Sequence, residues 1–131
     1  SRNAGLVEAN GEIVCFIDDR YLMDSDAINT FVSKLEPKTW VFGDKGADKS
    51  TFVENFSAVY KKDLVMMGGF NERIIYWGGM TRDITLKMRY NNIKSLYCPT
   101  ARCKTLMQSK SKYSKKDELI KAKLILWKLW R

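Results

Sequence analysis

The residues best suited to chemistry stand at the end of a near-continuous apolar run over residues 12–18, which closes in Asp18-Asp19-Arg20. Such a run predicts a buried strand of the parallel type, and ligands of open α/β sheets bind beyond the carboxyl ends of strands. Carboxylates there suit a hard divalent cation such as Mg²⁺ or Mn²⁺. A guanidinium instead suits phosphate oxygens. Asp18, Asp19 and Arg20 are therefore the first candidate binding residues.

Histidine and cysteine usage narrows the chemistry further. The chain has no histidine, which excludes His-containing catalytic triads, His metal sites and His proton relays. Its three cysteines, Cys15, Cys98 and Cys103, are odd in number and lack the C-x-x-C spacing of zinc sites. We expect buried, reduced thiols and hence a reducing compartment.

The charge of the chain is concentrated at one end. The 131 residues carry a net charge of +8 and are 45% hydrophobic, which fits one domain with a real core. Residues 1–100 are balanced in acidic and basic side chains, so the whole excess lies in residues 101–131. This placement, without any nucleic-acid motif, argues against a nucleic-acid partner. The sequence contains no run of eighteen apolar residues, so no conventional transmembrane helix is expected.

Helices and strands are expected to alternate along the chain. The pattern predicts helices over residues 2–9, 25–35, 61–67, 81–90 and 114–131, and strands over residues 12–18, 39–42, 51–60, 95–98 and 102–107, with residues 21–23 in a loop and Pro99 between the last two strands. This alternation predicts an α/β fold with a mostly parallel sheet flanked by helices.

Two ordered blocks of sequence carry a family resemblance. The first is R-N-x-G, then A-x-G-E, an apolar strand and an acidic tip, in which the matching residues are Arg2, Asn3, Gly5, Ala9, Gly11, Glu12 and Asp18. The second comprises Gly68-Gly69-Phe70-Asn71-Glu72, Tyr76-Trp77-Gly78-Gly79 and Asp83-Ile84. Together the blocks resemble family 2 glycosyltransferases, and the resemblance extends to about residue 110.

This resemblance implies a GT-A-like domain that lacks the first part of the usual domain. Residues 1–110 would form its C-terminal portion, and residues 111–131 a basic, apolar C-terminal helix. The family's opening strands, which hold the nucleotide base, have no counterpart here. We therefore expect that another chain supplies that half, that the sequence is a fragment, or that the fold is rebuilt.

The implied activity is inverting transfer of a sugar from a nucleotide-diphospho-sugar to the hydroxyl of a glycan or lipid-linked acceptor. Family positions expected to bind substrate are Arg2, Asn3, Asp18, Asp19, Arg20, Trp77, Gly78 and Gly79. Asp18 and Asp19 would hold Mg²⁺ or Mn²⁺, which neutralises the leaving diphosphate. Asp83 is the one catalytic candidate, although its family position is mainly structural. Trp77 suits either an acceptor-sugar platform or a buried aromatic.

Three departures from the family pattern leave the activity open. Arg20 replaces the last carboxylate of the metal motif, Met80-Thr81 replaces the acidic pair that contains the base, and the histidine expected near Thr105 is missing. The Arg20 guanidinium could replace the metal as the diphosphate's counter-charge, or simply pair with Asp18 or Asp19, which we favour. The alternative function is a catalytically inactive GT-A-like binding or assembly module.

The last helix is a second candidate site. Between residues 119 and 130, nine of twelve positions are apolar, and the surrounding basic residues are Lys115, Lys116, Lys121, Lys123, Lys128 and Arg131. Tryptophan, leucine and lysine together suit an interfacial helix on an anionic membrane. Docking against the protein body or a partner chain, with the lysines outward, is the slightly favoured alternative. The expected location is cytoplasmic, with a peripheral membrane position as the further option.

Overall fold

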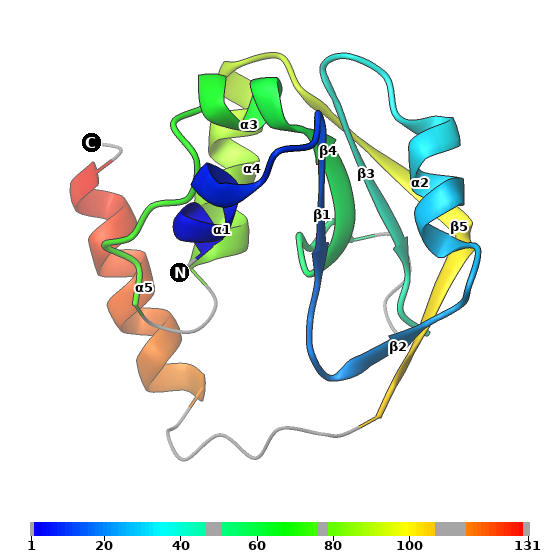
Figure 1. Ribbon diagram of the computed structural model, residues 1–131. Helices are drawn as coiled ribbons and strands as arrows, with labels where there is room; N and C mark the ends of the chain where they lie inside the picture. The colour runs from blue at the N-terminus through cyan, green and yellow to red at the C-terminus, as the bar shows by residue number, and fades with distance from the viewer. Residues whose placement is uncertain (1, 47–50, 76–78, 107–114, 130–131) are drawn as a thin grey trace.

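The computed structural model describes residues 2–46, 51–75, 79–106 and 115–129 (Figure 1). Its elements, in chain order, are α1 (Arg2–Glu8), β1 (Ile13–Ile17), β2 (Tyr21–Met23), α2 (Ala27–Lys34), β3 (Thr39–Asp44), β4 (Phe56–Tyr60), α3 (Lys61–Met66), α4 (Met80–Tyr90), β5 (Lys94–Thr105) and α5 (Lys115–Leu129). Helix α2 lies on one side of the sheet in Figure 1, and α1, α3 and α4 lie on the other.

The five strands form one mixed sheet in the order β1-β4-β3-β5-β2. Strand β4 runs antiparallel to both β1 and β3, and β2 runs antiparallel to β5. Among the strands that the structure describes, only the pairing of β3 with β5 is parallel. The long strand β5 pairs with β3 through its first half and with β2 through its last residues, so the sheet curves into a nearly closed, barrel-like shape.

The predicted mostly parallel, GT-A-like sheet is therefore wrong. Strand β4 follows β3 in the chain and pairs with it directly and antiparallel, whereas a parallel neighbour would need a crossover connection. The apolar run that indicated a buried parallel strand forms β1, which ends the strand order and has one buried residue, Val14. An apolar run can predict a strand, but it contains no information on the direction of that strand relative to its neighbours.

Two further expectations fail at β5 and β2. Residues 94–105 form one strand instead of two, and the register shifts where Gly43 and Asp44 of β3 meet it. Pro99 lies at this irregularity, where its missing N–H costs no regular ladder bond. The predicted loop at residues 21–23 is strand β2, which is paired with the end of β5.

Alternating side chains of the strands build two apolar clusters, one on each face of the sheet. Trp40 and Val59 pack with α1, α3 and α4, whereas Val41 and Ala58 pack with α2 on the opposite face. The adjacent positions Trp40 and Val41 are both fully buried, so β3 is covered on both faces. This central strand anchors the loops that carry the candidate site.

The cysteines are free thiols in this fold. Cys98 and Cys103 are buried, as expected, and Cys15 is half-buried. Burial raises the pKa of all three thiols, that of Cys103 to about 11.

Helix α5 contacts the body of the protein through Ala122, which is fully buried. Gly79 faces it so closely that a Cβ at Gly79 would lie 2.8 Å from that of Ala122 and 2.7 Å from Ile74. Docking of the last helix against the body is thus confirmed at this point. Among the described residues, none of the helices has the length and apolarity that crossing a bilayer requires.

Candidate functional site

The two sequence blocks meet through the side chain of Asn3 in α1. Its amide nitrogen donates to the Phe70 carbonyl at 2.8 Å, and its amide oxygen accepts from the Phe70 backbone N–H at 2.8 Å. The preceding turn is built by Gly68 and Gly69, with φ values of 82° and 64°, which glycine adopts at little cost. Asn3, expected to bind substrate, therefore holds α1 to the turn after α3.

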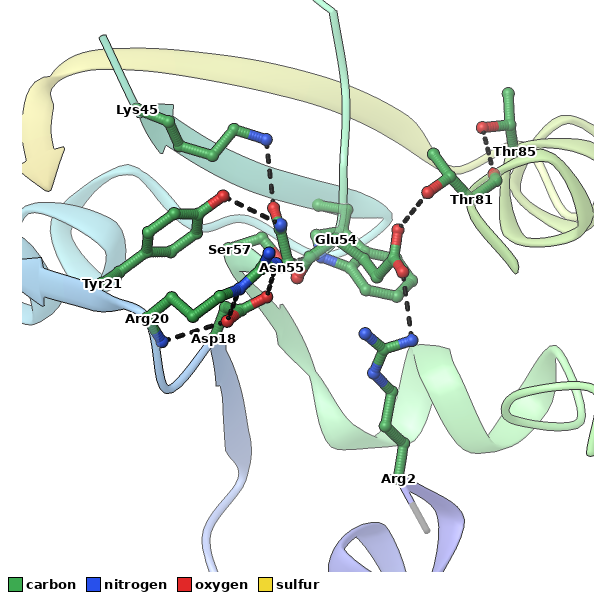
Figure 2. Close-up of polar contacts among 11 residues, drawn as sticks. Arg2, Asp18, Arg20, Tyr21, Lys45, Glu54, Asn55, Ser57, Thr81 and Thr85 are labelled. Carbon is green, nitrogen blue, oxygen red and sulfur yellow. Dashed lines mark hydrogen bonds and ion pairs between the residues drawn. The ribbon is translucent and has the colours of Figure 1, made fainter. Parts of the chain in front are cut away.

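Glu54 connects α1 to α4, as Figure 2 shows. Its side chain is only 4% exposed, and one oxygen pairs with the Arg2 guanidinium at 3.1 Å. The Thr81 hydroxyl, in the first turn of α4, donates to the other oxygen at 2.6 Å. Thr81 occupies the position where the resemblance implies an acidic residue, and the Glu54 carboxylate lies beside it.

Buried side chains of the sheet hold the backbone at Glu54 through hydrogen bonds. The Ser57 hydroxyl donates to the Glu54 carbonyl at 2.7 Å, and the Trp40 indole N–H donates to that hydroxyl at 2.9 Å. Ser57 and Trp40 are fully buried. Since buried hydrogen bonds restrict the groups that they join, Glu54 is held in one position.

In the segment after β1, Asp18 and Arg20 form an ion pair with each other. The Arg20 Nε donates to Asp18 Oδ1 at 2.8 Å, and Nη2 pairs with Oδ2, so the guanidinium engages both carboxylate oxygens. These hydrogen bonds hold the pKa of Asp18 well below its ordinary value and raise that of Arg20. The favoured expectation, that Arg20 pairs with one of the two aspartates, is confirmed with Asp18. Asp19 is exposed.

A divalent cation does not fit this tip. Both oxygens of Asp18 already accept from a guanidinium, which would also repel the ion. Mg²⁺ is usually bound through one or two carboxylates together with substrate phosphates and waters, and here the guanidinium takes up the carboxylate that Asp18 would supply. Across the described ranges, the structure brings together no group of three or more metal-ligating His, Cys, Asp or Glu side chains.

Asn55 connects Asp18, directly after β1, to Glu54, which contacts both Arg2 and Thr81. Its carbonyl accepts from the Asp18 backbone N–H at 3.0 Å. Its side-chain amide donates to the Tyr21 hydroxyl at 3.0 Å and accepts from the Lys45 ammonium at 3.0 Å. Because Glu54 and Asn55 are consecutive, Asp18 and Thr81 lie at two ends of one polar row, with Glu54 between them in Figure 2.

A cavity of about 460 Å³ adjoins the Thr81 end of this row. It is lined by Thr51, Phe52, Thr81, Arg82, Thr85, Leu86 and Arg89. Arg82 and Arg89 are exposed on the same side of α4, seven residues apart. Two guanidiniums, hydroxyl groups and an apolar wall make a lining suited to an anionic ligand with a nonpolar or ring-shaped part.

Asp83 does not face a binding site. Its side chain is fully buried and pairs with Lys87, one helical turn further along α4, at 3.2 Å. The Lys87 ammonium also donates to the Gly69 carbonyl at 2.8 Å. These contacts give Asp83 a structural role and leave it outside the polar row.

Of the expected substrate-binding residues Trp77, Gly78 and Gly79, the structure describes Gly79. Trp77 and Gly78 lie outside the described residues. Gly79 is buried between Ile74 and Ala122, where it allows α5 to approach α4 closely. Among the residues expected to bind substrate, the polar row contains Arg2, Asp18 and Arg20.

Sequence reasoning missed Glu54 and Asn55. The only available signal was a pair of polar residues directly before the apolar strand β4, and such pairs are common at strand starts. A comparison with protein-family models finds no matching family, and a comparison with curated proteins finds no relative. The resemblance to glycosyltransferases therefore depends on the residues of the two blocks.

Proposed function

We propose that this chain is a glycosyltransferase-like domain that binds a nucleotide-diphospho-sugar without a metal ion. The observation that carries the proposal is the bridge from Arg2 through Glu54 to Thr81, because it joins a matching residue of the first block to the position where the family pattern has its acidic pair. The diphosphate would be bound by protein cations, since the acidic tip does not fit a divalent ion.

The cavity beside Thr81 supplies two of those cations, Arg82 and Arg89. Guanidinium groups form bidentate bonds to phosphate oxygens and remain charged at any physiological pH. Thr85 directs its hydroxyl to the Thr81 carbonyl at 2.7 Å, which orders the wall of the cavity. A ligand bound here would contact the row at Thr81.

A second candidate is binding without sugar transfer. Transfer needs a general base within hydrogen-bond reach of the acceptor hydroxyl. The carboxylate that contacts Thr81 is Glu54, which is buried and already accepts from Arg2 and Thr81. A carboxylate with both oxygens engaged is a poor base, and this observation favours an inactive binding or assembly module.

Calorimetric titration tests the binding. UDP-glucose, UDP-N-acetylglucosamine and GDP-mannose are titrated into the chain in EDTA, and again with Mn²⁺. We expect saturable binding of at least one of them, equal in both buffers. The double change Arg82→Ala and Arg89→Ala should weaken it at least about tenfold, since each removes a charge-assisted phosphate contact. Arg73→Ala, at another exposed arginine, is the matched control.

Absence of binding for all three ligands would overturn the proposal, and binding that requires Mn²⁺ would overturn its metal-free form. Release of UDP or GDP, measured after incubation with each nucleotide-sugar and a panel of sugar acceptors, separates the two candidates. Release above the uncatalysed rate identifies a transferase. Binding without release identifies the module.

A further inference from the structure

Helix α5 has two apolar faces, of which the protein body covers one. Ala122 is fully buried against Gly79. On the outer face, Ile120, Leu124 and Trp127 are 49%, 56% and 56% exposed. Spacings of four and three residues place these three side chains within roughly 60° of one another around the helix. The Cα of Ala122 lies on the opposite side of the helix from this stripe.

Basic residues flank the outer stripe. Lys121 and Lys123 are exposed and lie to either side of it by helical position. Asp117 is also exposed and belongs to the same face, so the stripe is not uniformly basic. Residues 101–131 nevertheless contain the whole net charge of +8. The helix thus combines an exposed apolar stripe with an excess of positive charge.

The exposed apolar stripe and the positive charge of α5 together indicate which kind of partner fits this face. Nucleic acid would match the charge but would leave the apolar stripe in water. A neutral apolar protein groove would match the stripe but not the lysines. An anionic bilayer matches both, because its acyl boundary takes large apolar side chains while its headgroups attract Lys and Arg.

We propose that α5 binds the surface of an anionic membrane, with its axis in the membrane plane. Ile120, Leu124 and Trp127 would enter the acyl boundary, and Lys121 and Lys123 would contact the headgroups. Fifteen residues give a helix about 22 Å long, which suits lying in the interface and is short for spanning it. This inference is independent of nucleotide-sugar binding.

The position of α5 relates the membrane to the candidate site. Its contact with Gly79 lies directly before α4, whose first turn contains Thr81. A membrane bound at the outer face of α5 would therefore lie on the far side of that helix from the start of α4. In Figure 1, α5 lies at the edge of the molecule, away from α2 and the sheet.

Vesicle co-sedimentation of the full chain tests the proposal. Vesicles of phosphatidylcholine alone are compared with vesicles that also contain the anionic lipid phosphatidylglycerol. We expect binding to the anionic vesicles that falls as salt rises, because headgroup attraction is screened. The double change Leu124→Ser and Trp127→Ser should lower the partition coefficient at least about tenfold.

A matched control exists on another helix. Ile28 and Val32 of α2 are 38% and 47% exposed at a spacing of four residues. Ile28→Ser with Val32→Ser should leave vesicle binding unchanged. Circular dichroism and the Tm of each variant establish that it is folded. As a second variant, Lys121→Glu with Lys123→Glu should weaken binding to anionic vesicles while keeping the apolar stripe.

Three results would overturn the proposal. One is failure of the unaltered chain to bind anionic vesicles at low salt. Another is an equal loss of binding in the α5 and α2 variants. The third is concentration-dependent self-association that Leu124→Ser with Trp127→Ser abolishes, without vesicle binding, since the outer face would then be an interface between two copies. Nucleotide-sugar titration of the same variants distinguishes failure here from failure of the proposed function.

Discussion

Replacement of Asp83 by asparagine tests whether this residue is structural or functional. The Asp83 side chain is 1% exposed, and its charge is balanced by Lys87, whose side chain is 17% exposed. Asp83→Asn removes the negative charge but leaves the ammonium nearly buried, where it still donates to the Gly69 carbonyl. Breaking a buried pair in this way costs about 3–5 kcal/mol.

The partial exposure of Lys87 lowers that cost, because water can approach the ammonium. We expect a loss of about 2–4 kcal/mol in the free energy of unfolding, and a Tm lower by roughly 10 °C for a domain of this size. Urea unfolding followed by tryptophan fluorescence measures the change, since Trp40 is fully buried in the folded chain. Glu36→Gln, at an exposed acid, is the control and should change stability by less than about 0.5 kcal/mol.

The joint change Asp83→Leu and Lys87→Met gives a second measure. Replacing both partners of a buried pair by apolar residues is often neutral, so this variant should be more stable than Asp83→Asn. The reasoning is refuted if Asp83→Asn costs less than about 1 kcal/mol. If that variant instead loses nucleotide-sugar binding with its stability intact, Asp83 belongs to the site.

Three further predictions concern packing and pH. Gly43→Ala would place a methyl group against the Phe56 ring and should cost about 2–4 kcal/mol by urea unfolding. The pKa of Asp18 is lowered by Arg20, so the stability from this pair is present above about pH 4 and is lost as pH falls further; Arg20→Gln should flatten acid unfolding. Burial raises the pKa of Cys103 to about 11. The stability that the neutral thiol contributes is therefore lost between about pH 8.5 and 11, and Cys103→Ala should reduce the fall in the free energy of unfolding over this range.

Each of the three has a contrary outcome. Gly5→Ala is the packing control, because a Cβ there meets no atom within 4 Å and alanine favours the helix. If it destabilises as much as Gly43→Ala, close packing is not the cause. Acid unfolding that Arg20→Gln leaves unchanged would contradict the depressed pKa of Asp18. Rapid reaction of the Cys103 thiol with Ellman's reagent in the folded chain at pH 8 would contradict its burial.

Local patterns in the sequence predict the helices well but not the strand directions. The Asn10-Gly11 pair and the Gly68-Gly69 pair correctly predicted ends for α1 and α3. At Gly68 and Gly69 the reason is a left-handed turn, which glycine favours after a helix. Strand direction depends on the connection between β3 and β4, which takes residues 45–55 of the sequence. That connection contains no apolar period from which a crossover helix could be recognised or excluded.

The candidate site depends on contacts between residues far apart in the chain. Arg2 and Glu54 are separated by 52 positions, and Glu54 and Thr81 by 27. The first sequence block predicted a role for Arg2, whereas Thr81 was identified only as a departure from the family pattern and Glu54 lies in neither block. Its role follows only from the sheet, which brings the start of β4 between α1 and α4. By contrast, the Asp18–Arg20 pair is local, and sequence reasoning anticipated it.

The start of α4 connects the two proposals. Thr81 contacts Glu54 on one side, and two residues earlier Gly79 contacts Ala122 of α5 on another. A side chain at Gly79 would push α5 away, and it would also disturb the first turn of α4, where the polar row ends. The close packing at this glycine therefore links the position of α5 to the first turn of α4, so the two proposed surfaces share one structural junction.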